Sequence, residues 1–210
     1  MFTADQVWGL AVAADRVNEG YIKESVYDFE VDQRNPVKEA NKAIVERWLR
    51  EQDFSAATAE DIDRGRAVRH YFNGFLLKEL SGKINDFERQ ALKIAQKEEF
   101  TGRDMLDFAI VSCLPSVMLR DQARNEIAHE IRVSEQLAVK EGHAVILDIT
   151  VITSRFSQAY GKYRTLARSG ESFVDFWISS ELKGTVRVKA KVKQHRSDNT
   201  TQLNYVKIIG

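Results

Sequence analysis

The chain has 210 residues, of which 43% are hydrophobic and 30% are charged, and its 31 lysines and arginines balance 31 acidic residues. This composition excludes an intrinsically disordered chain, because disorder combines low hydrophobicity with high net charge. The single cysteine excludes an intrachain disulfide and a zinc site built from several thiolates. No apolar run reaches the roughly 20 residues that span a bilayer, and acidic residues stand early in the chain, so we expect a cytoplasmic protein without membrane contact.

The balanced charge conceals two oppositely charged segments. Residues 140–210 contain twelve lysines and arginines against six acidic residues, which leaves 19 basic and 25 acidic residues for 1–139. We therefore expect two domains, an acidic helical domain over 1–139 and a basic domain over 140–210. A basic domain favours a polyanionic partner, and the alternative is that the two oppositely charged domains dock on each other.

Residues 1–139 are expected to form a bundle of six helices, because apolar residues recur there every three to four positions. Two start signals are clear: Thr3 with Gln6 forms a capping-box pattern, and Thr58 with Asp61 opens the third helix. The expected helices cover residues 4–17, 36–52, 58–82, 85–100, 101–113 and 118–142.

Other signals define the remaining helix ends. Asn35 before Pro36 places a cap and a first-turn proline at the second helix, after an irregular segment over 21–34. Gly82 is suited to end the third helix. Thr101 is expected to cap the fifth helix, and Pro115 to interrupt the chain before the sixth.

Beyond Gly142 the apolar period changes to two, which is typical of strands. Clusters of glycine, serine, aspartate or asparagine separate the runs. Five strands in about 70 residues favour a small barrel or a strongly twisted sheet. The expected strands cover residues 143–156, 160–168, 172–179, 184–195 and 201–209.

The segment "LKGTVRVKAKVKQHRSDNTTQLNYVKI" resembles the end of an OB-fold, with a glycine turn before a long fourth strand and a polar loop before the fifth. It also resembles tail segments of bacteriophage replication proteins, and the whole chain is similar in layout to small phage proteins of unassigned role. This implies an α+β protein in which a helical bundle precedes a five-stranded OB-like barrel, acting in a host cytoplasm. Many OB-folds carry a helix between strands three and four, where this chain has only "ISSELKG", so an SH3-like or other small barrel stays open.

The expected fourth strand carries a row of cations at alternate positions. Its members are Arg187, Lys189, Lys191 and Lys193. They share one face and span about 20 Å, a spacing that a phosphate backbone can follow. The alternative is a solvated face on which lysines protect a sheet edge from aggregation.

In an OB-fold, nucleic acid lies across strands two and three, between the loop that joins strands one and two and the loop that joins strands four and five. Cations interleaved with aromatic residues are typical of single-strand binding, because phosphates need cations and bases stack on rings. Alternation places Phe173 and Trp177 on the opposite side of their strand from Val174 and Phe176. The candidates near the two loops are Arg155, Phe156, Tyr160, Lys162, Tyr163, Arg164, His195 and Arg196.

No motif of metal binding or catalysis stands out. His129 lies between Glu126 and Glu130 without a second histidine in register, so we expect no metal ion and no cofactor. The sequence contains no glycine-rich phosphate loop and no recognisable nucleophile context, so we expect no catalytic residues and no enzyme.

We interpret the chain as a binding protein for single-stranded DNA or RNA, an accessory factor in phage replication or recombination. Its helical domain is expected to contact a protein partner or a second copy. The alternative is an interaction protein that binds and redirects a host enzyme. A third reading is an enzyme whose site is assembled only in space.

Overall fold

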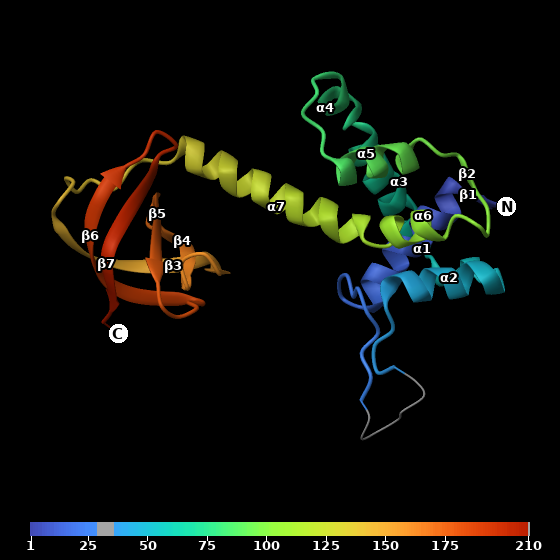
Figure 1. The fold of residues 1–210 in the computed structure, drawn as a ribbon, viewed down its shortest axis with the longest axis horizontal. Coiled ribbons are helices and arrows are strands. Elements are labelled where there is room, and N and C mark those ends of the chain that lie inside the picture. The colour runs from blue at the N-terminus through green and yellow to red at the C-terminus, as the bar shows by residue number, and fades with distance from the viewer. Residues whose placement is uncertain (29–35, 210) are drawn as a thin grey trace. The chain divides into compact units, whose positions relative to one another are not determined.

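The computed structural model describes residues 1–28 and 36–209, and it confirms the α+β class: helices fill the N-terminal part and a closed five-stranded barrel follows (Figure 1). The chain divides into two compact units, residues 1–122 and 123–210. The division falls within the last helix, whose first residues belong to the helical unit and whose last residues belong to the barrel unit. The boundary expected at residue 140 stays a prediction.

The helical unit is built from short helices around one apolar core that includes Trp8, Phe72 and Phe108. Its elements are β1 (Phe2–Thr3), α1 (Ala4–Val17), α2 (Asn41–Glu51), the 3-10 turn η1 (Phe54–Ala56), α3 (Ala59–Asn73), α4 (Leu76–Leu80), α5 (Asp86–Ala95), β2 (Glu99–Phe100), α6 (Met105–Val111) and the first part of α7 (Leu114–Val133). β1 and β2 pair as an antiparallel sheet. Among the described residues, no helix is long and apolar enough to cross a membrane.

The structure confirms both capping boxes. The N–H of Gln6 donates to Thr3 Oγ1 (3.3 Å), and the N–H of Thr3 donates to Gln6 Oε1 (2.8 Å). Thr58 and Asp61 exchange the equivalent bonds at the start of α3. Asp61 is also held by Arg16 of α1 at 2.8 Å. The start of α3 is therefore anchored to α1 as well as capped.

The prediction of a single helix over 58–82 is wrong, because the helix is interrupted at Gly74 and Phe75 and divides into α3 and α4. Glycine has the lowest helix propensity after proline, so a break costs least there. Gly82 does end α4, as expected, with a left-handed φ of +66° and an N–H that donates to the Glu79 carbonyl.

The second helix begins at Asn41 and not at residue 36. Asn35, its expected cap, and residues 29–34 of the expected irregular segment lie outside the described residues. The Asn41 side chain is fully buried, and its Oδ1 accepts a 2.8 Å hydrogen bond from Asn18 Nδ2. A buried amide that needs partners therefore sets the position of this helix.

The last three expected helices differ at their ends from α5, α6 and α7. α5 stops at Ala95, and the chain then pairs with β1 as β2. The cap of α6 is Asp104 and not Thr101. α7 takes Pro115 into its first turn, where a helix does not need the missing N–H, and it ends at Val133, short of the expected end.

α1 and α3 cross at very short range. A Cβ atom at Gly65 of α3 would lie 2.8 Å from the carbonyl carbon of Trp8 and 2.9 Å from the nitrogen of Gly9. Only glycine fits this crossing, because the atoms it faces are backbone atoms that cannot rotate away.

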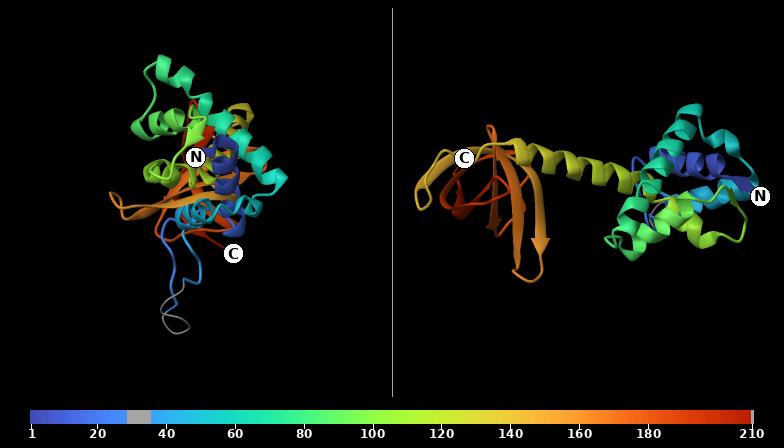
Figure 2. Two further views of the ribbon diagram at one scale, coloured as in Figure 1. Left: turned by 90° about the vertical axis from the view of Figure 1, so that its right-hand side faces the viewer. Right: turned by 90° about the horizontal axis from the view of Figure 1, so that it is seen from above.

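The five strands of the barrel lie where the period of two predicts them. They are β3 (Ala144–Ser157), β4 (Lys162–Ser169), β5 (Ser172–Ile178), β6 (Thr185–His195) and β7 (Thr200–Ile208). They close in the order β3-β4-β5-β7-β6, and β5 and β7 are parallel while every other pair is antiparallel. Figure 2 shows these strands, coloured orange to red, curling around a common axis. This arrangement is consistent with an OB-like fold.

One side of each strand fills the barrel interior. Ile149, Phe176 and Val188 are fully buried there. Between β5 and β6, where many OB-folds carry a helix, this chain places Leu182, which is 5% exposed and packs against the barrel core. Its N–H donates to Ser154 Oγ at 3.2 Å. The short segment therefore covers apolar surface with one leucine.

The end of α7 and the segment that follows it also support the barrel. Leu137 and Val139 pack against the barrel core. The Val139 carbonyl accepts from Nε2 of His195 at 2.9 Å, and the Arg132 carbonyl accepts from Nδ2 of Asn199 at 2.9 Å. These contacts belong to the barrel unit although they precede residue 140.

We expect Gly65→Ala to destabilise the protein by about 1–3 kcal/mol, the usual cost of overpacking. The control is Gly102→Ala, because a Cβ atom at Gly102 meets nothing within 4 Å. Urea unfolding of both variants measures the difference. Equal stability of the two would contradict the close crossing of α1 and α3.

We expect a fragment of residues 123–210 to fold alone, with a strand-rich circular dichroism spectrum. A fragment of 140–210 lacks Leu137 and Val139 and should be less stable by about 2–4 kcal/mol, because their apolar surface no longer covers the barrel. Thermal melting of both fragments tests this. Equal melting temperatures would instead support an independent domain that begins at residue 140.

Candidate nucleic-acid interface

The outer face of β4 and β5 lies between the two loops that the OB-fold resemblance indicates. Val174 and Phe176 point into the barrel core, which leaves Trp177 on the outer face, as the alternation predicts. The register of the two strands places three pairs on this face: Arg164 with Trp177, Leu166 with Asp175, and Arg168 with Phe173.

An aromatic pair lies at one end of this face. Tyr160 belongs to the turn that joins β3 and β4, and its ring centroid is 4.8 Å from that of Trp177. Tyr160 is 70% exposed. Trp177 is half-buried, so the exposed ring of Tyr160 offers most of the surface on which a nucleic-acid base can stack.

Cations surround the aromatic pair. Arg164 lies beside Trp177 and directly opposite Arg155 of β3, and Lys162 is exposed where β4 begins. Within 1–28 and 36–209, neither Arg155 nor Lys162 has an acidic partner in an ion pair. Arg155 and Lys162 therefore keep a positive charge at this end of the face, whereas Arg164 has an acidic partner.

Asp175 joins two arginines from different elements. Its side chain is 4% exposed, and its Oδ2 lies 3.0 Å from Nη2 of Arg196 and 3.5 Å from Nη2 of Arg164. Burial raises the pKa of the Asp175 carboxyl, and the two guanidinium groups oppose that shift. Arg196 comes from the loop after β6 and Arg164 from β4, so one buried carboxylate holds both guanidinium groups at this face.

The His195 side chain is hydrogen-bonded within the barrel unit. Its Nδ1 lies 3.0 Å from Thr201 Oγ1, and its Nε2 lies 2.9 Å from the Val139 carbonyl. Both ring nitrogens are therefore occupied within the protein, which leaves neither to contact a nucleic acid in this arrangement.

Phe156 and Tyr163 lie on a different side of the β3–β4 hairpin from Tyr160. They face each other across the two strands with ring centroids 5.3 Å apart. Their register positions alternate with the Arg155 and Arg164 pair. The Phe156–Tyr163 pair and the Tyr160–Trp177 pair therefore lie on opposite sides of this hairpin.

The four cations of β6 lie on another part of the barrel. β6 pairs with β3 and β7 and not with β4 or β5. Val188 and Val192 are buried inside, whereas the four cations, Arg187, Lys189, Lys191 and Lys193, are exposed. The twelve candidate residues therefore do not form one surface.

Two residues of this face were not among the candidates. Trp177 was already expected to lie opposite the core side of its strand, and its position beside Arg164 could have selected it. Asp175 is the acidic residue within the apolar run "SFVDFWI", a pattern that indicates a buried charge with a partner.

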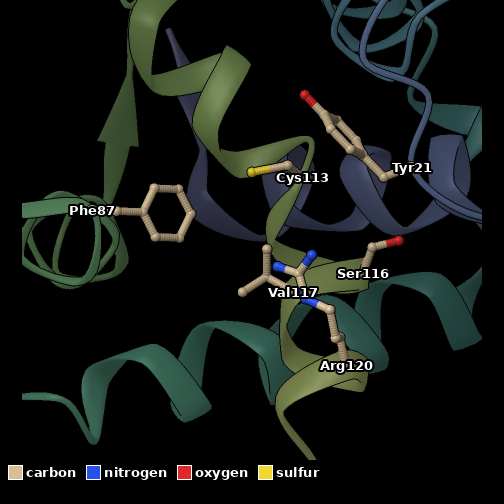
Figure 3. A pocket seen from close by; sticks show the side chains of 6 residues that line it. All are labelled: Tyr21, Phe87, Cys113, Ser116, Val117 and Arg120. Carbon is tan, nitrogen blue, oxygen red and sulfur yellow. The ribbon is translucent and has the colours of Figure 1, made fainter. Parts of the chain in front are cut away.

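The helical unit contains a hollow of about 570 Å³. In Figure 3 the rings of Tyr21 and Phe87 lie on either side of Cys113. Burial raises the pKa of the Cys113 thiol, which donates to the Ile110 carbonyl, so the thiol is a poor nucleophile. In the described parts of the chain, no three histidine, cysteine or acidic side chains cluster as a metal site would require.

Comparisons with known proteins found no match among family models, curated proteins or solved structures.

We expect the difference in stability between wild type and the Asp175→Asn variant to depend on pH. The raised pKa lets the folded protein bind a proton more readily than the unfolded chain, whose carboxyl titrates near 3.8. The stability from this group is therefore present at low pH and is lost as pH rises through the raised folded pKa. Wild type should gain stability relative to the Asn variant as the pH falls from about 7 towards 3.8, as urea unfolding at both values would show. A relative loss by wild type at the lower pH would contradict the assignment.

Proposed function

We propose that this protein binds single-stranded nucleic acid at the outer face of β4 and β5. The observation that supports this most is the ring pair of exposed Tyr160 and half-buried Trp177 beside Arg164. Stacking on rings is tolerant of sequence because every base has an aromatic face, and arginines next to the rings can contact the phosphates.

Each part of the face has one role in this proposal. Trp177 and Tyr160 stack a base. Arg164, Arg155 and Lys162 contact the backbone on either side of it. Asp175 is a positioning residue, because it holds the guanidinium groups of Arg164 and Arg196 without contacting the nucleic acid itself.

The proposed setting is phage replication or recombination, on the resemblance of the C-terminal segment to phage replication proteins. In this proposal the acidic helical unit contacts a protein partner or a second copy of the chain. The protein is non-catalytic, and its preference for DNA or RNA is left to the binding experiment.

Fluorescence anisotropy with labelled oligo-dT, oligo-rU and duplex DNA at two salt concentrations tests the proposal. Loss of a stacked base costs about 1–3 kcal/mol. We therefore expect Trp177→Ala to weaken single-strand binding by about 5- to 150-fold. The slope of log K against log salt should stay unchanged, because stacking releases no counterions.

Two further variants sharpen this experiment. Trp177→Phe keeps an aromatic ring and should retain most of the affinity. Phe156→Ala removes a 56% exposed ring from the other side of the hairpin and should have the smaller effect. A larger loss in Phe156→Ala than in Trp177→Ala would place the strand on the opposite side of the hairpin and contradict the proposal. Even non-specific binding is detectable at low salt. If no oligonucleotide binds there below about 100 μM, the proposal is wrong, and the alternative of an interaction protein that binds a host enzyme is favoured.

A further inference from the structure

The outer face of β6 and β7 carries four exposed lysines, which we call the lysine face: Lys189, Lys191, Lys193 and Lys207. Lys189 lies directly opposite Lys207 across the two strands. On its other side, β6 places Lys189 against Ile146 and Lys191 against Ala144 of β3. The cross-strand neighbours of Lys189 and Lys191 thus include no acidic residue: they are two apolar residues, Lys207 and, opposite Lys191 on β7, Asn204.

The fold leaves this charge uncompensated. No acidic group pairs with any of the four lysines in the segments that the structure describes, 1–28 and 36–209. At the end of the same row, Arg187 does have a partner, because its Nε lies 3.7 Å from Asp148. Lysines that face each other across a ladder reduce stability, so this arrangement has a cost that solubility alone does not require.

Protection of a sheet edge does not explain the lysines. Lysines guard edge strands because an edge presents unpaired backbone groups to other chains. β6 is paired on both sides, with β3 and with β7, in a closed barrel. It has no open edge to protect.

A strained aromatic residue lies beside the lysine face. Tyr205 of β7 has a φ of +55°, in the left-handed region that a bulky side chain rarely adopts. It lies at a shift of register between the Lys191–Asn204 and Lys189–Lys207 pairs, as a β-bulge does. Its side chain is 79% exposed, so burial does not offset the strain. Strained residues of this kind cluster at functional sites, and bulges redirect side chains there.

We infer that the lysine face and Tyr205 form a second nucleic-acid surface, separate from the β4–β5 face. The alternate lysines of β6 stand about 6.7 Å apart and contact successive phosphates, and Tyr205 stacks one base beside them. The assignment of single-stranded nucleic acid as the ligand of this face rests on the proposed function. A strand long enough to reach both surfaces binds to both, whereas a short one occupies a single surface.

The first test is the double variant Lys189→Gln/Lys191→Gln with oligo-dT of about 30 nucleotides, long enough to exceed the roughly 4–16 nucleotides that one OB-fold covers. Loss of two phosphate contacts should flatten the salt slope by about 1.4 units. The matched control is Lys83→Gln/Lys93→Gln, which removes the same charge from exposed positions of the helical unit and should leave the slope unchanged. An unchanged slope in the first variant overturns the inference.

The second test is Tyr205→Gly, which relieves the left-handed backbone and removes the ring. We expect the melting temperature to stay the same or rise while the affinity for the long strand falls by about 5-fold or more at unchanged slope. A lower melting temperature with unchanged affinity would mean that Tyr205 serves the fold, and would overturn its assigned role.

Stoichiometry separates this inference from the proposed function. Wild type should bind two oligo-dT octamers per chain at saturation, and the Lys189/Lys191 variant and Trp177→Ala should each bind one. If only Trp177→Ala loses a bound octamer, the lysine face is not a nucleic-acid surface and the proposed function stands. If only the lysine variant loses one, the lysine face stands and the proposed β4–β5 site is wrong. If polyglutamate binds with this lysine dependence and no oligonucleotide binds, the face belongs to an acidic protein partner and both proposals fail.

Discussion

The parallel pairing of β5 with β7 closes the barrel, and the rest of the C-terminal unit depends on it. Without this pairing β5 and β7 would both be edges of an open sheet. Once the barrel is closed, the side chains on one face of every strand must fill the interior. The side chains on the other face point away from the barrel axis. The direction of each outward side chain is then set by the place of its strand in the ring. This constraint assigns the aromatic pair to one surface and the lysines of β6 to another.

Charge is used differently in the two units. In the helical unit, arginines pair with acidic partners and hold elements together, as in the 2.8 Å pair of Arg16 with Asp61 and the 2.7 Å pair of Arg69 with Glu98. In the barrel, the lysines of β6 and β7 have no ion-pair partner among the residues that the structure describes. An exposed ion pair contributes little to stability, so the cost of this arrangement comes mainly from the lysines that face each other and not from the missing acidic partners. What the barrel keeps is a positive potential that attracts polyanions and can release their counterions on binding.

Local signals sufficed for much of the fold. The period of two located all five strands, because the pleat forces side chains to alternate wherever one face is buried. The Thr3 and Thr58 capping boxes were evident because a cap uses residues three positions apart. Helix ends that depend on distant partners were not evident: α2 begins at Asn41 because its buried amide bonds to Asn18, and β2 interrupts an expected helix because it pairs with β1.

For the candidate site, the sequence by itself determined which residue types are present and which face of its own strand each one takes. It placed the valines of β6 inside and the lysines outside, and Trp177 opposite Phe176. Only the tertiary structure decided which of these faces adjoin. Alternation is a property of one strand, whereas adjacency is a property of the closed ring, in which β6 neighbours β3 and β7 while Trp177 meets Tyr160 from another hairpin. The tertiary structure also placed Asp175 between Arg164 and Arg196, because a buried carboxylate needs opposite charges and the fold brings them from distant parts of the chain.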